Sequence, residues 1–278
     1  MKRWWLAATA LLALLAGCGG SVLPQVHDER GRLDLARRLY DKRDAAMAID
    51  VLAPFSTSST GAADVDEAVY LLGLCHLQVK DWLAAQADFE RLLRDYPESD
   101  SAGSAAFHLG NAFWGQSREP DFDQEYTLKA LEQWMTFRRD RPDHWLGPEA
   151  TRRIAEARSR LATKLYRTAD LYVKLKEYEA ARRYYKSVLT EYSETKLYGD
   201  AWIGWAVASC RMGERDTALA VLDEVEAHFA GTPLAAKASI TREEVIRWKM
   251  RKIVRRSRPN EPPPPTASPN SAPTGGMP

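Results

Sequence analysis

Cysteine and histidine are scarce in this chain of 278 residues, which has 3 cysteines and 5 histidines. So few thiols and imidazoles leave little material for a disulfide framework or a zinc cluster. Cys75 and Cys210 each fall among regularly spaced apolar residues, which is typical of small core residues. Cys75 and its neighbour His76 would point about 100° apart on a helix, which disfavours a nucleophile–base pair. The sequence therefore predicts no metal site and no disulfide.

An excess of charge of one sign is also missing, because 39 Lys and Arg residues stand against 38 Asp and Glu residues. A nearly neutral chain has no general attraction for nucleic acid. The chain contains no Gly-x-Gly-x-x-Gly, no Gly-Lys-Ser/Thr loop and no His-Glu-x-x-His. Asp121 and Asp123 allow a loose cation site, but a solvated loop is the simpler interpretation. We therefore expect a protein that is not an enzyme and that has no cofactor and no nucleic-acid partner.

Long hydrophobic runs are limited to a single stretch near the N-terminus, from Trp4 to Leu15. Its twelve residues are too few to cross a bilayer as a helix, which takes about 20. Lys2 and Arg3 precede the run, and a cationic start followed by a short apolar segment is typical of a secretory signal peptide. The run therefore predicts export from the cytoplasm rather than a membrane span.

The run ends in Leu15-Ala16-Gly17-Cys18, which resembles the lipobox of bacterial lipoproteins. The resemblance implies that residues 1–17 are a lipoprotein signal peptide. It also implies that Cys18 carries a covalent N-acyl diacylglycerol, with palmitate-like chains, and that residues 18–27 are the lipidated cysteine and a tether. Two or three acyl chains hold a protein on a membrane without a spanning helix. Gly19, where retained lipoproteins have Asp, resembles a signal for the outer membrane, facing the periplasm.

The body of the chain repeats a helical pattern. Gly73, Ala85, Phe89 and Pro97 have the spacing of a tetratricopeptide repeat, which is a pair of antiparallel helices. Small residues allow the two helices to cross closely, the aromatic ring fills the gap to the next helix, and proline cannot continue the helix that it follows. The spacing therefore predicts helix–turn–helix repeats rather than strands.

The same pattern recurs along the chain, with an insertion of about eight residues around 117–123 and a long helix over about 148–174. The other repeats are carried by Ala36, Ala48 and Leu52, by Gly110, Ala130, Trp134 and Pro142, by Ala169, Ala181 and Tyr185, and by Ala206, Ala218 and Leu222. We therefore predict an all-α fold, a tetratricopeptide-repeat solenoid of about five helix–turn–helix repeats.

A capping helix is expected after the last repeat, from Leu234 to about Arg256, and the solenoid would then occupy residues 28–256. Eight of the 15 prolines lie between Pro259 and Pro278. A segment rich in proline, serine and glycine cannot bury enough apolar surface to offset its loss of entropy. Residues 257–278 are therefore predicted to be a disordered tail.

A peptide-binding groove is predicted on the first helices of the repeats, at positions 2, 5, 9 and 12 of each. Aromatic rings offer apolar area, an amide can pair with a peptide backbone, and a guanidinium can pair with a carboxylate. The alternative is that several of these aromatic residues are packing residues. The candidate groove residues are Arg37, Tyr40, Tyr70, Phe107, Asn111 and Trp114.

The C-terminal helix ends in a basic run, for which two interpretations stay open. It is either a solvated polar face or a surface for an acidic partner or anionic lipid headgroups. The candidate partner-binding residues are Arg247, Lys249, Arg251, Lys252 and Arg255.

Three segments resemble the BamD (ComL) family, lipoproteins of the β-barrel assembly machinery. They are FERLLRDYPESD, EYTLKALEQWMTFRRDRPDH and the long PEATRRIAEARSRLATKLYRTADLYVKLKEYEAARRYYKSVLTEY. The likeness runs from about Asp66 to Pro233. Ser193 stands where the second repeat has Pro97, and neither the weak first repeat nor the proline-rich tail is typical of the family.

The resemblance implies a scaffold in outer-membrane protein assembly and membrane insertion. It implies a BamA-like barrel protein and other machinery subunits as partners, bound mainly through the C-terminal half. It further implies that the N-terminal repeats receive the C-terminal segments of unfolded outer-membrane proteins. The alternative is another envelope lipoprotein with the same repeats, either a secretin pilotin or a scaffold that coordinates cell-wall synthesis or division.

Overall fold

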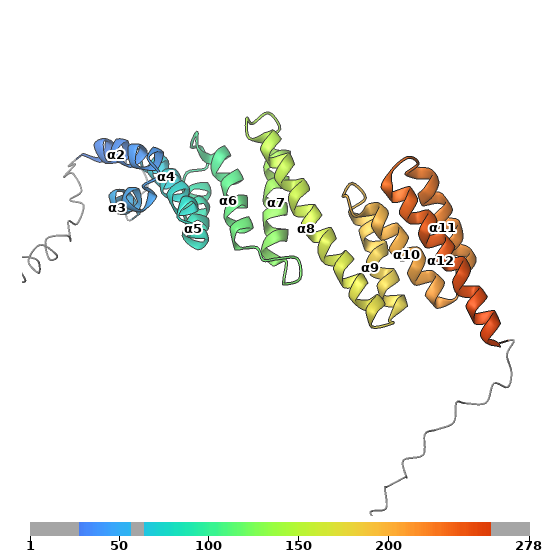
Figure 1. Cartoon of the computed structure of the whole chain (residues 1–278). Helices are drawn as coiled ribbons and strands as arrows, with labels where there is room; N and C mark the ends of the chain where they lie inside the picture. The colour runs from blue at the N-terminus through green and yellow to red at the C-terminus, as the bar shows by residue number, and fades with distance from the viewer. Residues whose placement is uncertain (1–27, 57–63, 257–278) are drawn as a thin grey trace, which may run out of the picture. The chain divides into compact units, whose positions relative to one another are not determined.

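The computed structural model describes residues 28–56 and 64–256 (Figure 1). All regular secondary structure in these residues is helical, which confirms the predicted all-α fold. The signal peptide 1–17, Cys18, the tether 18–27 and the tail 257–278 lie outside the described residues. The helices are α2 Glu29–Asp41, α3 Ala45–Ser56, α4 Val65–Gln78, α5 Trp82–Asp95, α6 Ala102–Gln116, α7 Glu125–Asp140, α8 Gly147–Lys174, α9 Tyr178–Glu191, α10 Tyr198–Met212, α11 Arg215–His228 and α12 Pro233–Arg256.

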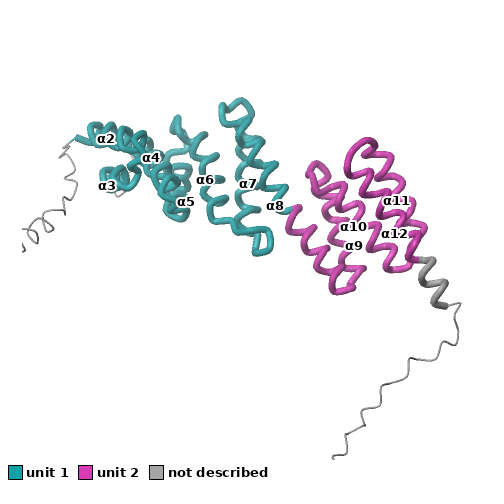
Figure 2. Tube along the Cα trace, in the orientation of Figure 1, with its two compact units in different colours: residues 1–161 teal, residues 162–278 magenta. Residues whose placement is uncertain are grey.

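The chain divides into two compact units, residues 1–161 and 162–278 (Figure 2). In the first unit, α2 packs on α3, α4 on α5 and α6 on α7, and each pair contacts the next through α3–α4 and α5–α6. In the second unit, α9 packs on α10, α10 on α11 and α11 on α12. The expected helix pairs and the capping helix are therefore present.

The turn inside a helix pair has the same backbone geometry in four of the pairs. Arg43, Lys80, Lys176 and Gly213 each adopt a positive φ, between 62° and 102°. Such a left-handed residue ends a helix and satisfies its last carbonyls, as when the N–H of Asp81 donates to the carbonyl of His76 at 2.9 Å. Glycine adopts this conformation without strain but stands at only one of the four positions. The turn is therefore set by the repeat rather than by a glycine signature.

The first and second helices of a pair meet at glycine. A Cβ added to Gly73 would lie 2.7 Å from the ring of Phe89, and a Cβ on Gly110 would overlap the indole of Trp134. The rings of Phe89 and Trp134 are fully buried, and the indole N–H of Trp134 donates to the carbonyl of Phe107 at 3.1 Å. These contacts confirm the predicted role of small residues at the crossings.

The insertion between α6 and α7 is held together by the side chain of Gln124, which is 7% exposed. Its Nε2 donates to the carbonyls of Glu119 at 2.9 Å and Phe122 at 3.1 Å, while its Oε1 accepts from the hydroxyl of Thr127 at 2.8 Å. The carboxylate of Asp123 accepts from the backbone N–H of Glu125 at 3.1 Å. The insertion is thus an ordered loop built around a buried amide.

Cys75 and Cys210 are buried and form no disulfide, as predicted for core residues. Burial raises the pKa of the Cys75 thiol to about 12. Among residues 28–56 and 64–256, no group of three or more His, Cys, Asp or Glu side chains is placed to hold a metal ion. None of the helices described there combines the length and apolar character needed to cross a membrane.

Candidate functional site

Three of the candidate groove residues, Tyr40, Tyr70 and Asn111, come from three first helices of the first unit and lie around one aromatic cluster. Tyr40 of α2 and Tyr70 of α4 are half-buried and pack against the core. The ring of Tyr70 lies 6.1 Å from those of Phe89 and His108, and burial raises the pKa of both tyrosines. The rings are thus amphipathic, with one side on the core and part of their surface exposed.

Asn111 extends this cluster on α6. Its Nδ2 lies 3.0 Å from Nδ1 of His108, while no described residue donates a hydrogen bond to its buried Oδ1. An unpaired buried acceptor costs about 1–3 kcal/mol. Reorienting this amide toward a bound chain would break no hydrogen bond at Oδ1. The side chain is therefore well suited to accept an N–H from a peptide backbone.

Phe107 does not belong to the groove. Its side chain is 2% exposed and its ring packs 5.7 Å from that of Phe137. Phe107 precedes Gly110 by three residues, so the two share the helix face that meets α7. This corrects the sequence-based assignment, and it supports the alternative interpretation that some of these aromatic residues are packing residues.

The remaining two candidates have partners within the chain. Arg37 of α2 pairs with Asp34 at 2.7 Å and with Glu67 of α4, and the hydrogen bond to Glu67 is the largest cause of its raised pKa. Trp114 lies beneath the guanidinium of Arg160, which is 3.8 Å from the ring centroid. A ligand carboxylate would therefore compete with Glu67 for Arg37, and one face of Trp114 is already covered.

Sequence reasoning missed His108, Glu67 and Arg160, which complete this part of the first unit. His108 precedes Asn111 by three residues, a spacing that places both on one helix face and that could have indicated the pair. Glu67 and Arg160 contact their partners from other helices, and no local pattern marks them.

The basic candidates lie on α12 in the second unit. Arg247 is exposed and pairs with Glu243 one turn earlier. Lys249, Arg251, Lys252 and Arg255 also belong to α12, but their side chains lie outside the described residues. For Arg247 the geometry is that of an exposed polar face, and the partner-binding role of the basic run stays a prediction.

We predict that acid destabilises the first unit through His108, whose pKa burial lowers to about 4 from 6.5. The unfolded state then binds more protons between these values, so stability is lost as pH falls from about 6.5 to about 4. The expected loss between pH 7 and pH 4.5 is about 2 kcal/mol. Urea unfolding at several pH values across this range measures the free energy of unfolding. His108→Gln should make that free energy depend less on pH. An unchanged slope in that variant would contradict the assignment.

Comparison with known proteins gives one family match. The model of the YfiO family, described as "Outer membrane lipoprotein", matches residues 77–224, which is more than half of the chain. No curated protein matches the chain.

The chain is also similar to two solved tetratricopeptide-repeat (TPR) structures. A thermophilic TPR protein of Thermus thermophilus is 18% identical, covering 77% of this chain and 98% of that chain at a TM-score of 0.35. The C-terminal part of a TPR repeat-containing protein from Cytophaga hutchinsonii is 12% identical, covering 77% and 95% at a TM-score of 0.33.

Proposed function

The chain belongs to the YfiO family of outer membrane lipoproteins, and we propose that it is a non-enzymatic scaffold of the machinery that assembles β-barrels in the outer membrane. The observation that carries the proposal is the family match over residues 77–224, which spans helices of both units. The match favours this role over that of a secretin pilotin or a cell-wall scaffold.

The proposed location is the periplasmic face of the outer membrane, with a diacylglycerol and an acyl chain on Cys18 as the anchor. The supporting features are the Leu15-Ala16-Gly17-Cys18 sequence and the family description. With this anchor, the repeats would work next to the membrane in which the barrels are inserted. A BamA-like barrel protein and other machinery subunits are the proposed permanent partners.

The proposed ligand of the first unit is the C-terminal segment of an unfolded outer-membrane protein, held in extended form. Tyr40, Tyr70 and His108 would contact its aromatic side chains, and Asn111 would pair with its backbone. Arg37 could take a terminal carboxylate only in exchange for Glu67, so its contribution to affinity is expected to be small. The site is thus apolar and amide-based rather than a cluster of cations.

Crosslinking in the native membrane tests this function. A photoreactive phenylalanine analogue in place of Tyr70 is expected to capture unfolded outer-membrane proteins, and Asn111→Ala is expected to reduce the yield severalfold. The same analogue in place of Glu132, an exposed residue of α7, is the control and should capture none.

The partner is tested in the same membranes by recovering the tagged full chain after chemical crosslinking. A BamA-like barrel protein should be recovered with it. Recovery of a secretin alone would contradict the proposed machinery, whatever the result at Tyr70.

A further inference from the structure

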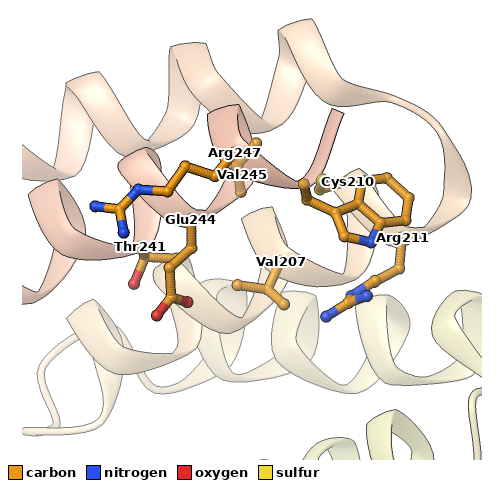
Figure 3. Close-up of a pocket in the computed structure, with 8 residues that line it drawn as sticks. Val207, Cys210, Arg211, Thr241, Glu244, Val245 and Arg247 are labelled. Carbon is orange, nitrogen blue, oxygen red and sulfur yellow. The ribbon is translucent and has the colours of Figure 1, made fainter. Parts of the chain in front are cut away.

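A hollow lies between α10 and α12 in the second unit (Figure 3), and a second, neighbouring hollow is lined by α10, the start of α11 and Trp248 of α12. One has a volume of about 320 Å³ and the other about 380 Å³, and both are lined by Cys210, Arg211 and Trp248. Because they share these residues, we treat them as one feature and name it the α10–α12 groove. It involves α12, which lies beyond the residues 77–224 matched by the family model.

The floor of the α10–α12 groove is apolar. Val207 is half-buried, and Cys210 and Val245 are 4% and 6% exposed. Trp248 adds an aromatic ring at the junction of the two hollows. Part of an aromatic or branched aliphatic side chain could lie on this floor and leave water, which favours binding.

Two arginines supply donors beside this floor. The exposed guanidinium of Arg211 lies 5.3 Å from the ring centroid of Trp248, and no described carboxylate pairs with it. Nε of Arg215, in the second hollow, is buried and has no hydrogen-bond partner among the described residues. A guanidinium stacked on an aromatic ring is oriented in advance for a planar carboxylate. The groove is therefore suited to an acidic group.

The charge of α12 also favours an acidic ligand. From Arg247 to Arg256 the helix carries six Lys and Arg residues and no Asp or Glu. Asp216 lines the second hollow and Glu244 the first, so the local excess of positive charge is modest at the groove itself and grows along the helix. A ligand with several carboxylates would gain from this gradient.

Glu244 distinguishes a peptide from a lipid headgroup or free phosphate. Its carboxylate is exposed, lacks a partner among the described residues, and lies across Val207 from Arg211 (Figure 3). Glu244 repels any anionic group that approaches it, but its carboxylate can accept the N–H of an extended backbone, a donor that a phosphate does not offer. The pair of a donor and an acceptor on either side of an apolar floor fits a peptide.

We propose that the α10–α12 groove binds an extended acidic segment of a protein partner. One aromatic or aliphatic side chain of the segment lies on the floor, and a neighbouring carboxylate pairs with Arg211. The proposal rests on the proposed function only in that the chain is a scaffold that binds proteins, and it does not involve the first unit.

Fluorescence anisotropy with the full chain tests the proposal, using the labelled peptide GSDEFDSG as the probe. Arg211→Gln is expected to weaken binding at least tenfold, because the hydrogen bonds to a charged group are lost. Trp248→Leu and the probe GSDEADSG should each weaken it severalfold. Arg183→Gln removes the same charge from an exposed position on α9 and should leave binding unchanged.

Three results would overturn the proposal. They are no binding of the probe to the wild-type chain, equal binding by Arg211→Gln and wild type, and binding of phosphatidylglycerol vesicles through Arg211 with no binding of the peptide. Failure of this assay leaves the crosslinking to a barrel protein unaffected, so the two proposals fail separately.

Discussion

Replacing Trp134 with alanine is expected to lower the free energy of unfolding of the first unit by about 3–5 kcal/mol. The side chain is fully buried on α7 and lies over Gly110 of α6. Its indole N–H donates to the carbonyl of Phe107, and its ring centroid lies 5.9 Å from that of Trp114. The substitution removes the largest fully buried side chain of the described residues and leaves a cavity at the crossing of two helices.

Trp145→Ala is the matched control, since Trp145 is 74% exposed in the loop between α7 and α8. Its ring stacks on His144 at 5.8 Å, so we expect a loss of less than about 1 kcal/mol. Urea unfolding measures the loss of stability in both variants. It is followed by circular dichroism rather than fluorescence, because removing a tryptophan changes the fluorescence directly. Equal losses in the two variants would show that the crossing at Gly110 does not depend on the buried ring.

Replacing Cys18 with alanine is expected to remove the lipid and with it the attachment of the protein to the outer membrane. Each buried CH₂ of an acyl chain contributes about 0.8 kcal/mol, so the two or three chains proposed for Cys18 would form a stable anchor. Labelled palmitate should enter the wild-type chain and be absent from the variant.

Cys75→Ala is the control for this experiment, because Cys75 is buried on α4 and its thiol pKa is raised by burial. Its labelling and fractionation should match those of the wild type. Label in the Cys18→Ala chain, or retention of that chain in the outer membrane, would contradict the lipid anchor and leave the fold of the repeats unaffected.

The spacing of small and aromatic residues predicted most of the fold. The long helix expected over about 148–174 is α8, Gly147–Lys174, and the capping helix expected from Leu234 is α12, Pro233–Arg256. The expected insertion is the loop between Gln116 and Glu125. These features are local in sequence, because helix periodicity, helix ends and crossing residues are set within one or two turns.

The candidate site was predicted less completely. Tyr70 and Asn111 are half-buried on first helices and their binding role stays a prediction, whereas Phe107 faces α7 and is buried. The position of a residue within the repeat fixes its helix face only to within one residue. This is too coarse to separate a groove residue from a residue at the edge of the packing face. The neighbour on the adjacent helix decides between them.

The sequence by itself determined the helix pairs, the residues at which they cross and the absence of a familiar catalytic motif. Only the tertiary structure decided which polar groups are engaged within the chain. Arg37 pairs with Glu67 and Arg160 covers Trp114, whereas Arg211 and Glu244 lie on either side of Val207, each without an ion-pair partner among the described residues (Figure 3). These differences arise because each such contact joins side chains from different helices, and the backbone must first bring those helices together.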